Sequence, residues 1–87
     1  MAGSDEATKE RVEKDIQKFY LNIGKIEGVT KDGNMLKIVD LSRMYASDAK
    51  SYLDKGDFIS AFSCISYAHG LLDAILKLNG SDSADVQ

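Results

Sequence analysis

The chain contains three stretches in which hydrophobic residues recur at helical spacing, and they predict three helices. In the first stretch the apolar residues form one narrow seam: Val12, Ile16, Phe19, Ile23 and Ile26. The positions around this seam are mostly charged, with Ser4 as a candidate N-terminal cap and Gly28 as a candidate stop. This pattern is typical of a helix that packs along one edge against other helices.

A polar segment with two glycines, residues 27–34, separates the first stretch from the second. Its Asp32-Gly33 pair is also a turn signal for a β-hairpin, which would place a strand on each side of it. The apolar pattern that follows Asn34 is too long and too helical for a strand. We therefore interpret the segment as a loop between two helices.

The second helix is predicted at about residues 35–55, with Asn34 as its cap. Its inner face is expected to combine apolar and aromatic residues: Ile38, Leu41, Tyr45, Ala49 and Tyr52, broadened by Leu36, Val39 and Leu53. Gly56 and Asp57 follow as a stop and a cap. So short a joint makes the second and third helices antiparallel neighbours.

The third helix is predicted from Phe58 to about Leu78, and it begins with an uncharged segment at residues 58–72 that must be covered on most sides. One face is expected to contact the second helix: Phe58, Ala61, Ile65, Ala68, Leu72 and Ile75. A flank is expected to receive the first helix: Phe62, His69 and Leu76. The remaining side carries small residues: Ser63, Ser66, Gly70 and Ala74.

The composition agrees with an all-α fold, since the chain of 87 residues has 44% apolar residues and neither proline nor tryptophan. We expect a three-helix bundle built on the antiparallel hairpin of the second and third helices. Residues 1–4 are expected to be flexible, residues 5–79 to form a single helical domain, and residues 80–87 to be a disordered tail. So small a core would gain stability from self-association or from a partner.

The net charge of −3 and the mixing of basic with acidic residues argue against a nucleic-acid-binding surface. The single cysteine, Cys64, excludes an internal disulfide and suits a reducing compartment. The N-terminal residues are not expected to be a secretory signal, and the uncharged segment is shorter than the roughly 20 residues that span a bilayer. We expect a cytoplasmic protein that does not bind membranes.

Four residues are candidates for a polar binding site: Tyr45, Asp48, His69 and Asp73. His69 and Asp73 stand one helical turn apart, a spacing that lets an imidazole and a carboxylate meet as an acid/base pair or as half a metal site. The chain has no Glu-x-x-His or His-x-x-x-His element to complete a metal site. The simpler interpretation is a half-buried histidine that donates to a carboxylate or carbonyl at a helix junction. We expect neither a metal nor a cofactor.

Gly70 falls inside the third predicted helix, where glycine costs about 1 kcal/mol relative to alanine, so a close approach of another backbone should compensate. The small-residue side would admit either the first helix of the same chain or a second protein. The second alternative makes four residues a candidate interface: Ser63, Ser66, Gly70 and Ala74.

The residues around the joint between the second and third predicted helices resemble two known kinds of helical protein. Several residues there fall at the consensus spacing of one tetratricopeptide-type hairpin: Tyr45, Ala49, Tyr52, Gly56, Phe58, Ala61, Ile65 and Ala68. No second copy of this repeat is present, so the resemblance implies one such hairpin, as in the small three-helix microtubule-interacting and trafficking domains.

The second resemblance rests on three motifs: Y-x-x-D-A at residues 45–49, K-G-D at 55–57 and Y-A-H-G-L-L-D-A at 67–74. With these motifs the chain resembles the archaeal domain of unknown function family 357. The resemblance implies a compact helical fold and an archaeal cytoplasmic origin, with no assigned activity. Members fused to nucleotidyltransferase-like domains imply an accessory role.

No catalytic constellation stands out. Ribonucleases of the HEPN type carry a lone histidine on a late helix, but the arginine expected before it is missing from residues 64–68. Cys64 lacks the basic neighbour that would activate a thiol. The sequence therefore favours a non-enzymatic interaction or scaffolding module, with a protein partner or a homodimer. The alternative is a small-ligand or nucleotide-binding accessory domain, or an enzyme, that uses the polar residues: Tyr45, Asp48, His69 and Asp73.

Overall fold

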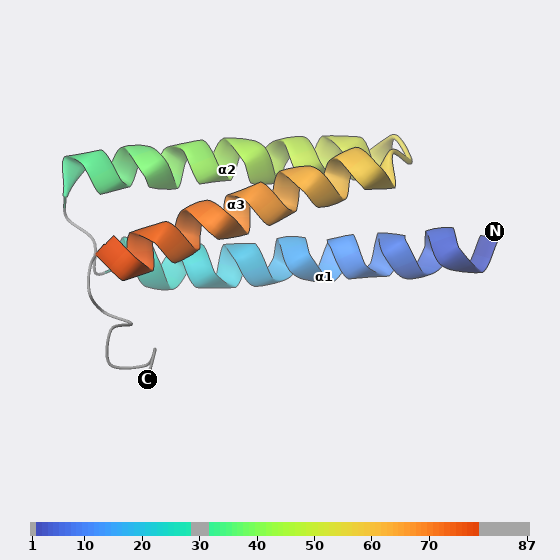
Figure 1. Cartoon of the computed structure of the whole chain (residues 1–87), viewed down its shortest axis with the longest axis horizontal. Coiled ribbons are helices and arrows are strands. Elements are labelled where there is room, and N and C mark those ends of the chain that lie inside the picture. Colours follow the sequence, from blue (N-terminus) through green and yellow to red (C-terminus); the bar gives the residue numbers. More distant parts are fainter. Residues whose placement is uncertain (1, 29–31, 79–87) are drawn as a thin grey trace.

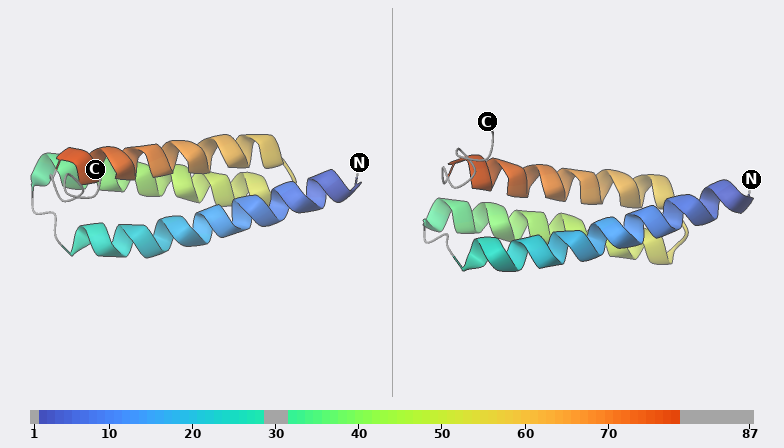
Figure 2. Two further views of the ribbon diagram at one scale, coloured as in Figure 1. Left: turned by 60° about the horizontal axis from the view of Figure 1, so that its bottom comes forward. Right: turned by 90° about the horizontal axis from the view of Figure 1, so that it is seen from below.

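The computed structural model describes residues 2–28 and 32–78, and this part of the chain forms three helices. They are α1 (Ala2–Glu27), α2 (Gly33–Asp54) and α3 (Phe58–Leu78). α2 runs antiparallel to both other helices, and α1 lies along one side of the α2–α3 pair (Figure 1, Figure 2). The most extensive contact is between α2 and α3, and α1 packs more on α3 than on α2. The predicted three-helix bundle on an α2–α3 hairpin is therefore confirmed.

The start of α1 differs from the prediction, since the helix begins at Ala2 and Ser4 lies inside it. A cap contributes only about 1 kcal/mol, so a helix can extend past a residue that favours capping. The predicted disordered tail at residues 80–87 lies outside the described part of the chain.

The apolar seam of α1 packs into the core as predicted. All five of its residues are buried: Val12, Ile16, Phe19, Ile23 and Ile26. The inner face of α3 is confirmed in the same way, with Ala61, Ile65, Ala68, Leu72 and Ile75 buried and Phe58 packed at its edge. Periodicity alone locates both faces because large apolar residues stand at their centres.

The joint between α2 and α3 also follows the prediction. Gly56 has a φ of +82°, and its N–H donates to the Leu53 carbonyl at 3.0 Å. The Asp57 N–H donates to the Tyr52 carbonyl at 2.9 Å, which completes a Schellman-type helix end. The Asp57 carboxylate then accepts from the Ser60 N–H at 3.1 Å and so caps α3. Hydrogen bonds from the side chain and the backbone of Ser60 lower the pKa of Asp57.

Two predictions about α2 were wrong. Its cap is Asp32 rather than Asn34, because the Asp32 carboxylate accepts from the N–H groups of Asn34 at 2.8 Å and Met35 at 3.3 Å. Its buried face is turned by about one residue from the expected one and consists of Val39, Ser42, Ala46, Ala49 and Leu53. Of these, Val39, Ala49 and Leu53 are buried as predicted, whereas Ser42 and Ala46 were not expected in the core. Small residues occupy the centre of this face, where the axes of α2 and α3 approach closely.

Ser42 is the polar member of this buried face. Its hydroxyl donates to the Val39 carbonyl of the preceding turn at 2.7 Å, so the buried oxygen has a partner. The rotation of α2 has a second consequence. The large residues expected in the core lie on its edge or outside it: Leu36, Ile38, Leu41, Tyr45 and Tyr52.

Candidate functional site

His69 joins α3 to α1. Its Nε2 atom lies 2.9 Å from the backbone carbonyl of Asp15, and its ring meets the Phe19 ring edge-on at 5.9 Å. Because a carbonyl oxygen only accepts, Nε2 carries the hydrogen and donates it. His69 is half-buried, so the contact matches the simpler interpretation of a histidine that donates at a helix junction.

A shallow groove between α1 and α3 surrounds His69. It is lined by Arg11, Asp15, Lys18 and Asn22 from α1 and by Phe62, Ser66, His69 and Asp73 from α3. The two basic and two acidic residues balance in formal charge. The groove therefore offers no net attraction for an anion or a cation.

Tyr45 and Asp48 lie elsewhere. The Tyr45 ring packs edge-on against the Tyr67 ring of α3, with the centroids 4.6 Å apart. Tyr67 and His69 are two residues apart on one helix, so their side chains leave the axis in directions about 200° apart. The structure therefore does not bring Tyr45 and Asp48 into one pocket with His69 and Asp73.

The environment of Cys64 agrees with an inert thiol. Burial raises the pKa of Cys64, and the negative charges of Asp48 and Asp57 add to that rise. A raised pKa leaves little thiolate at neutral pH, which is the reactive form.

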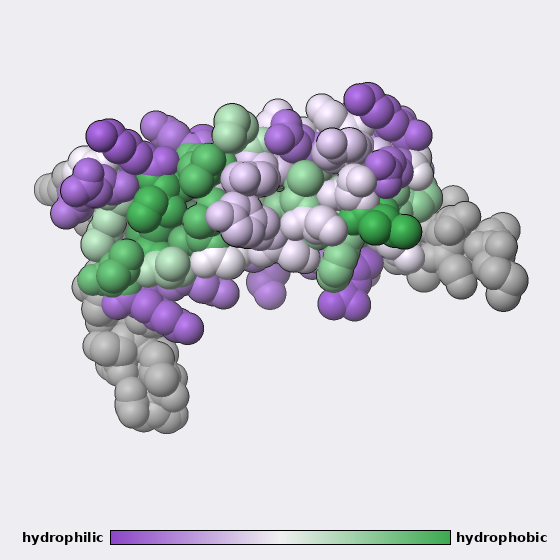
Figure 3. All heavy atoms as spheres, turned by 45° about the horizontal axis from the view of Figure 1, so that its top comes forward, coloured by the Kyte–Doolittle hydropathy of each residue, from purple (hydrophilic) through white to green (hydrophobic). Residues whose placement is uncertain are grey.

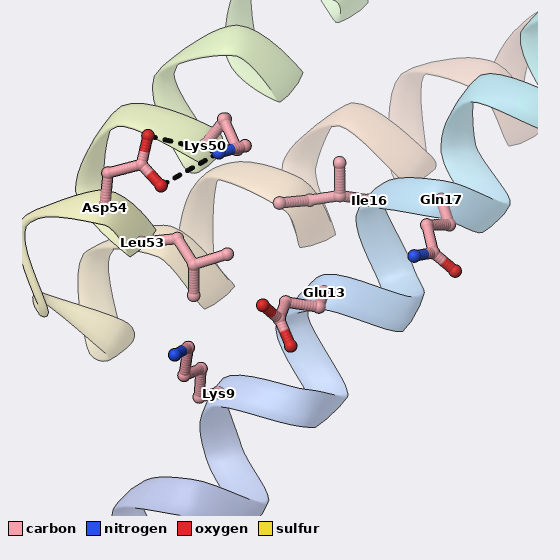
Figure 4. Close-up of a pocket in the computed structure, with 7 residues that line it drawn as sticks. All are labelled: Lys9, Glu13, Ile16, Gln17, Lys50, Leu53 and Asp54. Carbon is pink, nitrogen blue, oxygen red and sulfur yellow. Dashed lines mark hydrogen bonds and ion pairs between the residues drawn. The ribbon is translucent and has the colours of Figure 1, made fainter.

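A second groove, which the sequence did not suggest, lies between α1 and the end of α2 (Figure 4). It has an apolar floor with charged walls: Lys9, Glu13, Ile16, Gln17, Lys50, Leu53 and Asp54. Lys50 donates to both carboxylate oxygens of Asp54, at 2.8 and 3.1 Å, and this contact raises the pKa of Lys50. Both side chains are mostly exposed, so the pair contributes little to stability.

The candidate interface on α3 is open to solvent. All four of its residues are exposed: Ser63, Ser66, Gly70 and Ala74. A Cβ atom added at Gly70 would meet no atom of the described residues within 4 Å. α1 of the same chain therefore does not cover this side at Gly70, although Ser66 lines the groove beside α1.

Beside this side of α3 lies a group of exposed and half-buried apolar residues. We define the outer face as the exposed and half-buried apolar residues on the side of the α2–α3 pair away from α1: Ile38, Leu41, Met44, Tyr45, Tyr67, Leu71 and Leu78. Four of them are exposed, with 37% of Leu41, 53% of Met44, 52% of Tyr67 and 65% of Leu78 open to solvent. Apolar side chains gather over α2 and α3 towards the end where α2 begins and α3 ends (Figure 3).

The sequence contained the signal for the outer face, but it was assigned to the core. Ile38, Leu41 and Tyr45 were expected to line the inner side of α2, and the rotation of that helix turns them outward. Their spacing therefore correctly predicted an apolar stripe on α2. The prediction that this stripe lies inside the core of the chain was wrong.

Two further observations limit the kinds of site available. Among residues 2–28 and 32–78, no group of three histidine, cysteine or acidic side chains could hold a metal ion.

α3 is long and apolar enough to cross a membrane by length and composition. A core helix satisfies the same criterion, and the inner face of α3 is buried against its neighbours.

These features define a small three-helix protein with an exposed apolar face, in which the four predicted polar-site residues do not share one pocket. A family model described as "Protein of unknown function (DUF357)" matches residues 9–80. The chain therefore belongs to this family, and the resemblance inferred from the motifs at residues 45–74 is confirmed. A comparison with curated proteins finds no match. Because the family description states no activity, function has to be argued from the surface.

Proposed function

We propose that this protein is a non-enzymatic interaction module of the cytoplasm, which binds protein partners through the outer face. The observation that carries the proposal is the exposed apolar surface that α2 and α3 share (Figure 3). Soluble monomers rarely expose contiguous apolar patches larger than a few hundred Å², and such patches commonly mark binding surfaces.

The residues of α2 support this role. The helix closes its own bundle mainly with small side chains, since Ser42, Ala46 and Ala49 are buried. Its larger side chains, such as Leu41 and Met44, are exposed and contribute little to the core. Large apolar residues that the fold does not need are expected where a partner covers them.

The alternative function is a small-ligand or nucleotide-binding site, or an enzyme, built from Tyr45, Asp48, His69 and Asp73. That function needs the four side chains to converge. The placement of Tyr45 against Tyr67, on a different side of α3 from His69, argues against it. The interaction module requires no such convergence.

The proposal is tested by affinity capture from the source cells with three forms of the chain: wild type, Leu41→Asp and Leu21→Asp. Leu21 lies on α1 outside the outer face and is 71% exposed, so it controls for a new charge at an exposed leucine. We expect wild type and Leu21→Asp to retain the same proteins and Leu41→Asp to lose them, while circular dichroism shows all three equally helical. Equal retention by Leu41→Asp would contradict the proposal, and so would a wild-type chain that retains nothing.

A further inference from the structure

We infer that the partner of the outer face is a second copy of this chain, bound with the two α2 helices antiparallel and a two-fold axis that passes between them at the level midway between Leu41 and Met44. The inference rests on the proposed function and names the occupant of the same face. An isologous contact of this kind places the same patch on both sides, so the patch must complement itself.

The charges along α2 have that self-complementarity. Lys37 stands four residues before Leu41, and Asp48 stands four residues after Met44. The successive spacings of four, three and four place these residues on one stripe of the helix, and all of them are exposed. A two-fold rotation between Leu41 and Met44 therefore brings Lys37 of each copy to Asp48 of the other.

Both charges are available for such a contact. Within the described part of the chain, neither the Lys37 nor the Asp48 side chain makes a hydrogen bond or an ion pair. Lys50 and Asp54, two and six residues beyond Asp48 on α2, form an ion pair with each other in the same helix. Opposite charges that flank an apolar centre fix the register of two helices more than they add to affinity.

A different two-fold arrangement, with the axis parallel to the helices, would lay α2 of one copy on α3 of the other. The contact between Tyr45 and Tyr67 sets the register of α2 against α3 and places Lys37 level with the region of Lys77. That arrangement would bring Lys37 near Lys77 of the second copy. Like charges oppose it, so the charge pattern favours the arrangement with α2 on α2.

The same axis explains the glycine in α3. The Tyr45–Tyr67 register places Gly70 level with Leu41 and Met44, close to where the axis passes beside α3 in the interface. Gly70 has open space where a Cβ would stand, so nothing in the described part of its own chain compensates for the cost of glycine in a helix. A second copy at the axis would bring its α3 backbone close to this position.

The test uses the full chain in sedimentation equilibrium, with Lys37→Asp and Asp48→Lys measured separately and as an equimolar mixture. Each variant alone places like charges at both ends of the contact, so we expect its dimer Kd to rise roughly tenfold or more. In the mixture, the aspartate introduced in one variant meets the lysine introduced in the other at one end of the contact. The native Lys37 and Asp48 meet at the other end, so we expect a heterodimer with a Kd close to that of the wild type. Lys14→Asp on α1 makes the same change in net charge as Lys37→Asp but lies outside the outer face, and it should leave the Kd unchanged.

Three results would overturn the inference: a wild-type chain that stays monomeric at about 1 mM, single variants that dimerise as well as the wild type, or a mixture that dimerises no better than its components. Each would leave the proposed function to the separate comparison of Leu41→Asp with Leu21→Asp. A monomeric chain whose captured partners depend on Leu41 would thus refute the dimer and support the interaction module. If the mixture dimerises and the single variants do not, the result supports the register in which Lys37 of each copy meets Asp48 of the other.

Discussion

Gly70→Ala should stabilise the monomer, although Gly70 lies in the middle of a helix in the most apolar part of the chain. Alanine is favoured over glycine in a helix interior by about 0.8–1.0 kcal/mol. The new Cβ would meet no atom within 4 Å in residues 2–28 and 32–78, so no steric cost from this part of the chain offsets the gain. For a domain of 87 residues, a gain of about 1 kcal/mol corresponds to a rise in Tm of about 4–8 °C.

Two other glycines provide matched controls. Gly24 lies in α1 and also has open space where a Cβ would stand, so Gly24→Ala should raise the Tm, by less because it is near the end of the helix. Gly56 has a φ of +82°, a conformation that costs an L-residue about 1–2 kcal/mol, so Gly56→Ala should lower the Tm.

The assay is thermal unfolding by circular dichroism at a concentration low enough to keep the chain monomeric. We expect the order Gly70→Ala, Gly24→Ala, wild type, Gly56→Ala from the highest Tm to the lowest. A Gly70→Ala variant that melts below the wild type would mean that another part of the chain covers this side of α3. The outer surface of α3 would then be an internal contact, which would refute its assignment as an exposed surface.

Three further predictions concern the core and the caps. His69→Ala should lower the free energy of unfolding by about 1–3 kcal/mol because it removes the hydrogen bond to the Asp15 carbonyl, and urea titration should show His69→Gln to be milder if its amide reaches that carbonyl. Ala49→Leu should destabilise the protein by about 1–3 kcal/mol in the same titration, since Ala49 is buried at the contact with α3, whereas an exposed Ala49 would tolerate leucine. The folded-state pKa of Asp57 is lowered, so its contribution to stability is present above the ordinary carboxyl range and is lost as the pH falls through the folded pKa. Stability measured across acidic pH should therefore change less steeply in Asp57→Asn, and identical profiles would contradict the capping role.

The helices and two of their three inner faces could be predicted from the sequence because their signals are local. The seam of α1 has one apolar edge on a charged helix, which leaves a single way to bury it. Gly56 and Asp57 fix the end of one helix and the start of the next through their own backbone preferences. None of these features depends on the distance between helices.

The inner face of α2 depends on that distance, and this is why it was predicted incorrectly. Hydrophobicity alone predicts that α2 buries Leu41 and Tyr45. Close packing against the small residues Ala61 and Ala68 of α3 instead favours the burial of small residues such as Ala46. Two helices that approach closely bury many atoms of both, so the small face of α2 becomes the buried one. The pattern of a single helix does not contain this information.

The candidate polar site could not be tested from the sequence, because it depends on how the three helices are oriented relative to one another. Whether Asp48 and His69 share a pocket is decided by the rotation of α2 and α3 about their axes and by the position of α1. The hydrogen bond of His69 goes to α1, to a residue 54 positions away, and no spacing in the sequence signals it. The groove in Figure 4 likewise joins residues of α1 to the end of α2.

The central claim, that the outer face binds a second copy of this chain, is tested most directly by NMR of the backbone amides over a dilution series of the wild-type chain. We expect concentration-dependent shifts at residues of the outer face and beside it, such as Leu41, Met44 and Gly70, and constant signals around Leu21 on α1. Shifts confined to α1, or spectra that do not change up to about 1 mM, would contradict self-association through this face.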